Sequence, residues 1–126
     1  MTPKAIGIIT LIVAMVVESF AQVSLKIGAS GGPQILSSPY RQMASRYRVS
    51  ASPSAWKALG ILLYGLEIFL WTLVLNRLDL SIAFPMGSLC FVGVALLSML
   101  FLGELVDRVR WLGVFCILSG AVLMAL

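Results

Sequence analysis

The chain has 126 residues, of which 60% are hydrophobic and 11% are charged, with a mean hydropathy of +1.05 and a formal net charge of +4. These values exclude an ordinary soluble domain, in which about a quarter of the residues are charged, and they predict an integral membrane protein. The chain has no histidine, no glycine-rich phosphate loop and no serine or cysteine nucleophile motif. We therefore expect no enzymatic activity, no cofactor, no metal and no nucleic-acid partner.

Four apolar windows, at about residues 5–25, 59–75, 80–102 and 111–126, approach the roughly 20 residues that cross a bilayer. They predict an all-α bundle of four transmembrane helices, a single membrane domain over residues 1–126. A long loop, residues 28–56, joins the first two windows. Residues 40–49 of this loop carry apolar side chains at helical spacing, which predicts a short helix at the headgroup level. A disordered basic loop is the alternative.

The nine basic residues are divided unevenly between the two ends of the predicted bundle. Only Lys4 and Arg77 lie at one end, whereas the other end carries Lys26, Arg41, Arg46, Arg48, Lys57, Arg108 and Arg110. Because basic loops stay in the cytoplasm, both termini are expected outside the cytoplasm and the long loop inside it.

The first window contains a carboxylate and an amide. On a helical wheel, Glu18 and Gln22 share a stripe with the small residues Gly7, Ala14 and Ala21, and with Leu11, while the opposite side is bulky and suits lipid: Ile9, Val13, Val16, Phe20, Val23 and Ile27. Glu18 precedes Lys26 by eight residues, so it lies roughly 12 Å below the interface. This stripe predicts contact with protein or with a cavity.

The second window repeats this pattern with Glu67, which is ten residues from both Lys57 and Arg77 and so about 15 Å from either surface. Tyr64 and Trp71 share its face, as does Gly60, and a carboxylate between two aromatic rings suits an ammonium group. A carboxylate at this depth stays neutral, finds a partner or faces water. The alternative is that Glu18 or Glu67 is a protonated residue that holds helices together.

The third window contains Pro85, which removes one backbone hydrogen bond and predicts a bend within a single helix. Ser81 and Ser88 lie on the side of Pro85 and are expected to line the same cavity as the carboxylates, unless they only bond to their own helix. In the last window, Gly113 and Gly120 are seven residues apart and predict a dimer seam. Cys90 and Cys116 fall inside spans, so we interpret them as small apolar residues.

Several segments resemble the drug/metabolite transporter superfamily. "SFAQVSLKIGAS", "LWTLVLNRLDLSIAFPMGSLCFV" and "LGELVDRVRWLGVFCILSGAVLM" resemble its small aminoarabinose-lipid flippase subunits, which move an undecaprenyl-phosphate-linked aminosugar across the inner membrane of Gram-negative bacteria. The glutamate in the first span and the run "SGAVLMAL" are similar to the small multidrug resistance branch. The flippase subunits have no acid at the position of Glu18, whereas the drug antiporters do, and Glu67 has no acidic counterpart in either group.

The resemblance implies a transporter or flippase of a lipid-linked aminosugar, or of a related amphipathic amine. Substrate-binding residues would then be Glu18, Gln22, Tyr64, Glu67, Trp71, Ser81, Pro85 and Ser88, and the phosphate would be captured by Lys26, Arg41, Arg46 and Arg48. A fixed orientation implies a second small four-span subunit of opposite topology, or a parallel homodimer. The alternatives are a proton-coupled exporter of hydrophobic cations and a membrane assembly subunit that transports nothing.

Overall fold

The computed structural model describes residues 2–29, 52–103 and 105–126, and all regular structure in these ranges is helical. The elements are α1 (Pro3–Ala29), α3 (Pro53–Leu75), α4 (Leu80–Gly87), α5 (Cys90–Leu97), the π-helical turn η2 (Ser98–Leu102) and α6 (Arg108–Ala125). The prediction of an all-α fold is confirmed. The predicted interfacial helix at 40–49, with Arg41, Arg46 and Arg48, lies outside the described residues.

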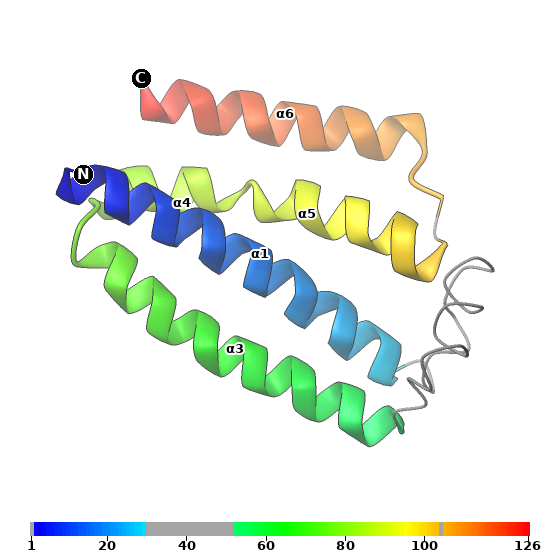
Figure 1. Ribbon diagram of the computed structural model, residues 1–126. Helices are drawn as coiled ribbons and strands as arrows, with labels where there is room; N and C mark the ends of the chain where they lie inside the picture. Colours follow the sequence, from blue (N-terminus) through cyan, green and yellow to red (C-terminus); the bar gives the residue numbers. More distant parts are fainter. Residues whose placement is uncertain (1, 30–51, 104) are drawn as a thin grey trace.

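Three stretches of the described chain are long and apolar enough to cross a membrane: Pro3–Ala29, Pro53–Leu75 and Leu80–Leu102, each with a mean hydropathy of 2.1. The fourth expected span corresponds to α6, whose 18 residues rise about 27 Å. The protein is therefore a multi-pass membrane protein. The helices run side by side, and both termini lie at the same end of the bundle (Figure 1).

α1 and α3 form the most closely packed pair. Gly7, Ala14, Ala21 and Gly28, which recur every seven residues, are all buried on α1. A Cβ atom at Gly60 of α3 would lie 2.6 Å from Leu25 Cγ and 3.2 Å from the Ala21 carbonyl oxygen, so only glycine allows this approach. Small residues at a membrane helix interface bring the two backbones together in this way.

The exposed side of α1 agrees with the expected bulky face at Ile9, Val13, Val16 and Phe20. The expectation was wrong for Val23 and Ile27, which are only 5% and 1% exposed. Both side chains pack with Leu102 of η2, and Trp56 of α3 borders the same cluster. The neighbouring helices cover this end of α1, so a side chain that the wheel assigns to lipid is buried there.

The third span is two helices and a π-helical turn, and the prediction of a single bent helix was wrong. Pro85 has no N–H to donate, and beyond it the Ser88 and Leu89 amides bond to carbonyls three residues back, at 3.2 and 3.1 Å. α4 therefore ends at Gly87 and α5 begins at Cys90. At the far end, η2 stops at Gly103, whose φ of 64° is a left-handed conformation that glycine adopts without strain.

α6 begins at a local cap, in which the Asp107 carboxylate accepts a hydrogen bond of 3.0 Å from the Arg110 backbone N–H. The helix lies beyond α4 and α5, on the side away from α3 (Figure 1). Large apolar side chains such as Leu112, Phe115 and Leu123 are more than 60% exposed. Most of the surface of α6 is thus left for lipid or for another protein.

Candidate functional site

The antiparallel packing of α1 on α3 places Glu18 and Glu67 at the same level. Gly60 meets Ala21 and Leu25 below this level, and Gly7 meets Leu78 above it, so the two acids lie at similar heights between these contacts. Glu67 is only 8% exposed and Glu18 is half-buried. The two carboxyl groups are close enough to interact electrostatically. The tertiary structure thus brings together two acids that are 49 residues apart in the chain.

Trp71 holds the buried acid by a hydrogen bond. Its Nε1 donates to Glu67 Oε1 at 2.9 Å, one helical turn away on α3. The indole ring also packs at 5.6 Å from the ring of Phe84, and a Cβ at Gly87 would lie 3.3 Å from it. Trp71 therefore turns its N–H edge, and not its ring face, to Glu67, so it orients the carboxylate.

Tyr64 and Cys90 complete the surroundings of the acids. Tyr64 is half-buried on α3, and Cys90 is buried at the start of α5. Each lies within electrostatic range of both Glu18 and Glu67. A phenol and a thiol can donate or accept protons next to the carboxylates. These four side chains from α1, α3 and α5, together with Trp71, form what we call the acid cluster.

Sequence reasoning missed Cys90 and Ser19. Ser19 Oγ lies 2.8 Å from the Met15 carbonyl oxygen and 3.4 Å from that of Cys90, and Gly93 leaves room for it. A cavity of about 150 Å³ adjoins this contact. The sequence does mark both positions, because Ser19 follows Glu18 directly and Cys90 follows the interruption after Pro85. Neither position predicts that α1 contacts α5.

The other residues expected at the substrate site are spread along the bundle. Ser88 is half-buried, and its hydroxyl donates to the Pro85 carbonyl oxygen at 2.6 Å, which agrees with the alternative that it bonds to its own helix. Ser81 is exposed in the first turn of α4, about two turns from Ser88. Gln22 is exposed and shares a separate pocket with Lys26.

The glycines of the expected dimer seam, Gly113 and Gly120, are exposed on α6. A Cβ atom at either one would have no neighbour within 4 Å in the part of the chain that the structure describes. The structure therefore leaves this surface of α6 open.

The acid cluster can bind a cation. Two carboxylates held together in a region of low dielectric repel each other, and a cation or a proton between them relieves that repulsion. Among the described residues, no group of three or more His, Cys, Asp or Glu side chains has the arrangement of a metal site. An organic ammonium group is a suitable ligand for such a site, since it forms charge-assisted hydrogen bonds with carboxylates.

No solved structure matches the chain significantly. Over 82 residues the chain is 43% identical to the probable 4-amino-4-deoxy-L-arabinose-phosphoundecaprenol flippase subunit ArnE of Pectobacterium atrosepticum, a match that covers 65% of this chain and 70% of that protein. The protein of the same name from Yersinia pestis is 43% identical over 70 residues, which are 56% of this chain and 61% of its own length, less than two thirds.

The profile of the EamA-like transporter family matches residues 35–126, and this range includes α3 through α6. The match covers more than half of the chain. With its apolar helices and its flippase-subunit relatives, this chain belongs to the EamA-like transporter family.

Proposed function

We propose that this chain is a subunit of a flippase that moves an undecaprenyl-phosphate-linked aminosugar outward across the bacterial inner membrane. The observation that carries the proposal is that Glu18 and Glu67 lie within electrostatic range of each other inside the membrane-spanning bundle. An aminosugar carries an ammonium group, which needs such a partner in order to cross the hydrocarbon region. The names of the relatives, which are flippase subunits for an aminoarabinose lipid, fit this chemistry.

In this proposal the acids bind the ammonium group while Trp71 keeps Glu67 oriented, and Tyr64 contacts the sugar. Ser81 and Pro85 on α4 and Ser88 directly after it follow one another along the path that we assign to the sugar, and Arg41, Arg46 and Arg48 attract the phosphate at the cytoplasmic surface. Burial supports the part played by the acids: a carboxylate that is 8% exposed at this depth is stabilised when a cation joins it.

The chain works as one membrane domain with a partner. Four short spans are too few to enclose a complete substrate path, and small transporters commonly combine two halves of opposite topology. The positive-inside bias gives this chain cytoplasmic basic ends and periplasmic termini, so a second small four-span subunit supplies the other half. The open surface at Gly113 and Gly120 on α6 is where the two subunits meet, whether the partner is that protein or a second copy.

The proposal is tested with Glu18→Gln and Glu67→Gln in cells that lack their own aminosugar-lipid flippase. Glutamine keeps an oxygen that accepts the Trp71 hydrogen bond but removes the charge. Aminosugar lipid reaching the outer leaflet of spheroplasts is labelled with an amine reagent that cannot cross the membrane. Each variant should reduce labelling at least about ten-fold, because a charge-assisted contact contributes roughly 1.5–3 kcal/mol.

Asp107→Asn is the matched control, because this acid is exposed at the start of α6 and asparagine also caps helices. It should label like the unchanged protein. If both glutamine variants flip lipid at the normal rate while remaining in the membrane, the proposed role of the acids is wrong.

A proton-coupled exporter of hydrophobic cations is the second candidate. It is favoured by Glu18, which the drug antiporters share, and by the phenol and thiol next to it, which can exchange protons. In that case Glu18→Gln abolishes cation tolerance and proton release but leaves modified lipid unchanged. An assembly subunit without a substrate would instead lose co-purification of its partner in the same variant.

A further inference from the structure

A second polar site lies one to two helical turns from the acid cluster. A pocket of about 220 Å³ opens between α1 and the α5–η2 segment, and it is lined by Gln22, Val23, Lys26, Val94, Ser98 and Leu102. This volume is several times the roughly 30 Å³ that one water molecule occupies in the liquid. Three of the lining side chains are polar and three are apolar. We call it the Lys26 pocket.

Its polar side chains come from two elements. Gln22 and Lys26 are four residues apart on α1, so they lie one above the other on the same face. Ser98 is the first residue of η2, where the wider π-helical turn replaces the α-helix, and such turns often occur at functional sites. The Ser98 hydroxyl donates to the Ala95 carbonyl oxygen at 2.9 Å.

The Ser98 hydroxyl is able to serve a ligand. The Ala95 carbonyl oxygen also accepts the backbone N–H of Ser98, so it keeps a hydrogen bond when the hydroxyl rotates into the pocket. Lysine, the glutamine amide and serine then provide donors of three kinds. A ligand with several acceptor oxygens and a negative charge can accept hydrogen bonds from all three side chains.

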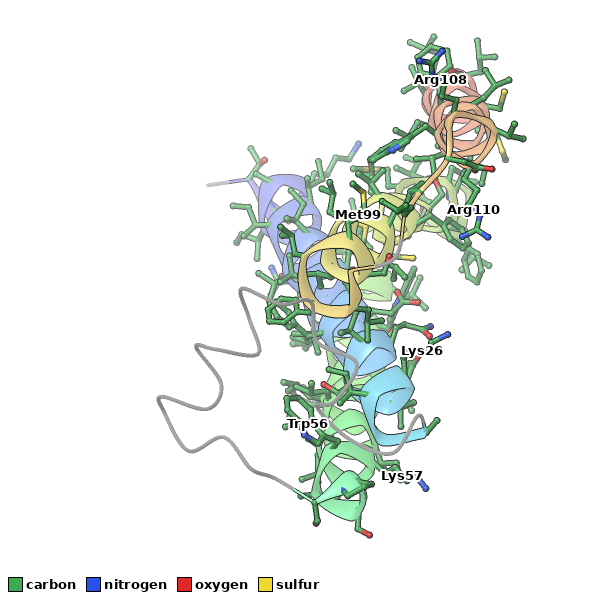
Figure 2. All side chains as sticks on the ribbon, turned by 90° about the vertical axis from the view of Figure 1, so that its right-hand side faces the viewer. Lys26, Trp56, Lys57, Met99, Arg108 and Arg110 are labelled. Atoms are coloured by element: carbon green, nitrogen blue, oxygen red, sulfur yellow. The ribbon has the colours of Figure 1, made fainter. Side chains whose placement is uncertain are left out.

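The position of the pocket points to an anionic lipid group. It lies at the end of the bundle that also carries Lys57, Arg108 and Arg110, and the Lys26 side chain points to the opposite side of the α1–α3 pair from Trp56 (Figure 2). Lys26 is three residues before the end of α1, at the level where a bilayer places its headgroups. Each basic side chain near this surface attracts anionic lipid.

We propose that the Lys26 pocket binds the phosphate of a long-chain phosphate ester, the lipid carrier of the proposed substrate. The Lys26 ammonium and the Gln22 and Ser98 donors contact the phosphate oxygens, while Val23, Val94 and Leu102 contact the first carbons of the chain. This inference rests on the proposed function and deepens it. Gln22, which the sequence grouped with Glu18, belongs to this site.

The acid cluster and the Lys26 pocket lie one after the other along one face of α1. Glu18, Gln22 and Lys26 are spaced by four residues, so each lies one turn nearer the surface than the last. A lipid whose phosphate is held at Lys26 presents its amine toward the acid cluster. The Lys26 pocket therefore receives the substrate at the interface before the acids take the amine. The apolar side chains of the pocket favour a lipid ester over free phosphate. The hydrocarbon chain of an ester covers these side chains, whereas free phosphate would place only a charged group against them.

The experiment measures binding of undecaprenyl phosphate to the purified full chain in maltoside micelles, which contain no phosphate. The probe has no amine, so its binding does not depend on the aminosugar chemistry and can fail or succeed separately from the proposed function. Lys26→Gln should weaken binding at least about five-fold. Lys26→Arg should bind the lipid within about two-fold of the affinity of the unchanged protein, since arginine also binds phosphate. Ser98→Ala should have a smaller effect in the same direction.

Lys57→Gln is the matched control, because Lys57 is an exposed lysine at the same end of the bundle but outside the pocket. It should bind like the unchanged protein. Equal loss in Lys26→Gln and Lys57→Gln would mean a general effect of surface charge and would overturn the proposal. So would binding of undecaprenol as tight as that of its phosphate, or inorganic phosphate competing at the same concentration as the lipid ester.

Discussion

The α1–α3 pair and α6 represent two different kinds of helix surface in one bundle. On α1 and α3, glycine is required at the contact, since a Cβ at Gly60 would meet Leu25 and one at Gly7 would lie 2.8 Å from Leu78 Cγ. On α6, a Cβ at Gly113 or Gly120 meets no atom of the described residues within 4 Å. A glycine in a membrane helix can therefore lie at a close helix contact inside the subunit or on an exposed surface. The sequence around it does not tell these two cases apart, because they differ only in whether a neighbouring helix packs there.

This difference has a functional consequence. The close contact of α1 with α3 sets the level of Glu18 against Glu67, so the acid cluster depends on it. α6 lies outside that cluster and contributes surface. Changes in the first region should alter stability and transport together, whereas changes in the second should alter assembly alone.

The largest effect is expected from Gly60→Leu. The new side chain collides with Leu25 and with the Ala21 backbone, and overpacking of this kind lowers the free energy of unfolding by about 1–3 kcal/mol, with two clashes placing this change at the upper end. Gly65→Leu is the control in the same helix, because a Cβ there meets no atom of residues 2–29, 52–103 or 105–126 within 4 Å. Unfolding in mixed micelles measures both. Equal stability of the two variants would contradict the close contact.

A smaller loss is expected from Trp71→Phe. The variant removes the Trp71 ring N–H, which donates a hydrogen bond to the Glu67 carboxylate. A hydrogen bond to a charged group contributes about 1.5 kcal/mol or more. Trp56→Phe is its control, since the Trp56 Nε1 is buried and has no hydrogen-bond partner among the described residues. That control should be neutral or stabilising by thermal melting in the same micelles. The prediction fails if Trp56→Phe costs as much as Trp71→Phe.

The smallest effect on stability is expected on α6. Gly113→Leu combined with Gly120→Leu should change the free energy of unfolding by less than about 0.5 kcal/mol, as for other exposed sites. Co-purification of a tagged partner subunit, or of a second tagged copy, should fall several-fold because the flat surface is lost. A stability loss like that of Gly60→Leu would instead show that α6 packs inside the subunit.

The sequence predicted features that depend on a single helix. Composition and apolar windows identified membrane helices, since the bilayer requires about 20 apolar residues per span. The period of the helix placed Glu18 with Gly7, Leu11, Ala14 and Ala21, and Glu67 with Gly60, Tyr64 and Trp71. Gly7, Leu11, Ala14 and Ala21 are buried, as are Gly60 and Glu67.

Features that depend on two helices were decided by the tertiary structure. The level of α1 against α3, the burial of Val23 and Ile27, the approach of Cys90 to the acids and the Lys26 pocket all arise where distant segments meet. Trp71 is an instructive case: its place beside Glu67 follows from helical spacing, but whether its edge or its face meets the carboxylate depends on Phe84 and Gly87 of α4. Periodicity specifies which face of a helix a residue occupies, and packing specifies what that face meets.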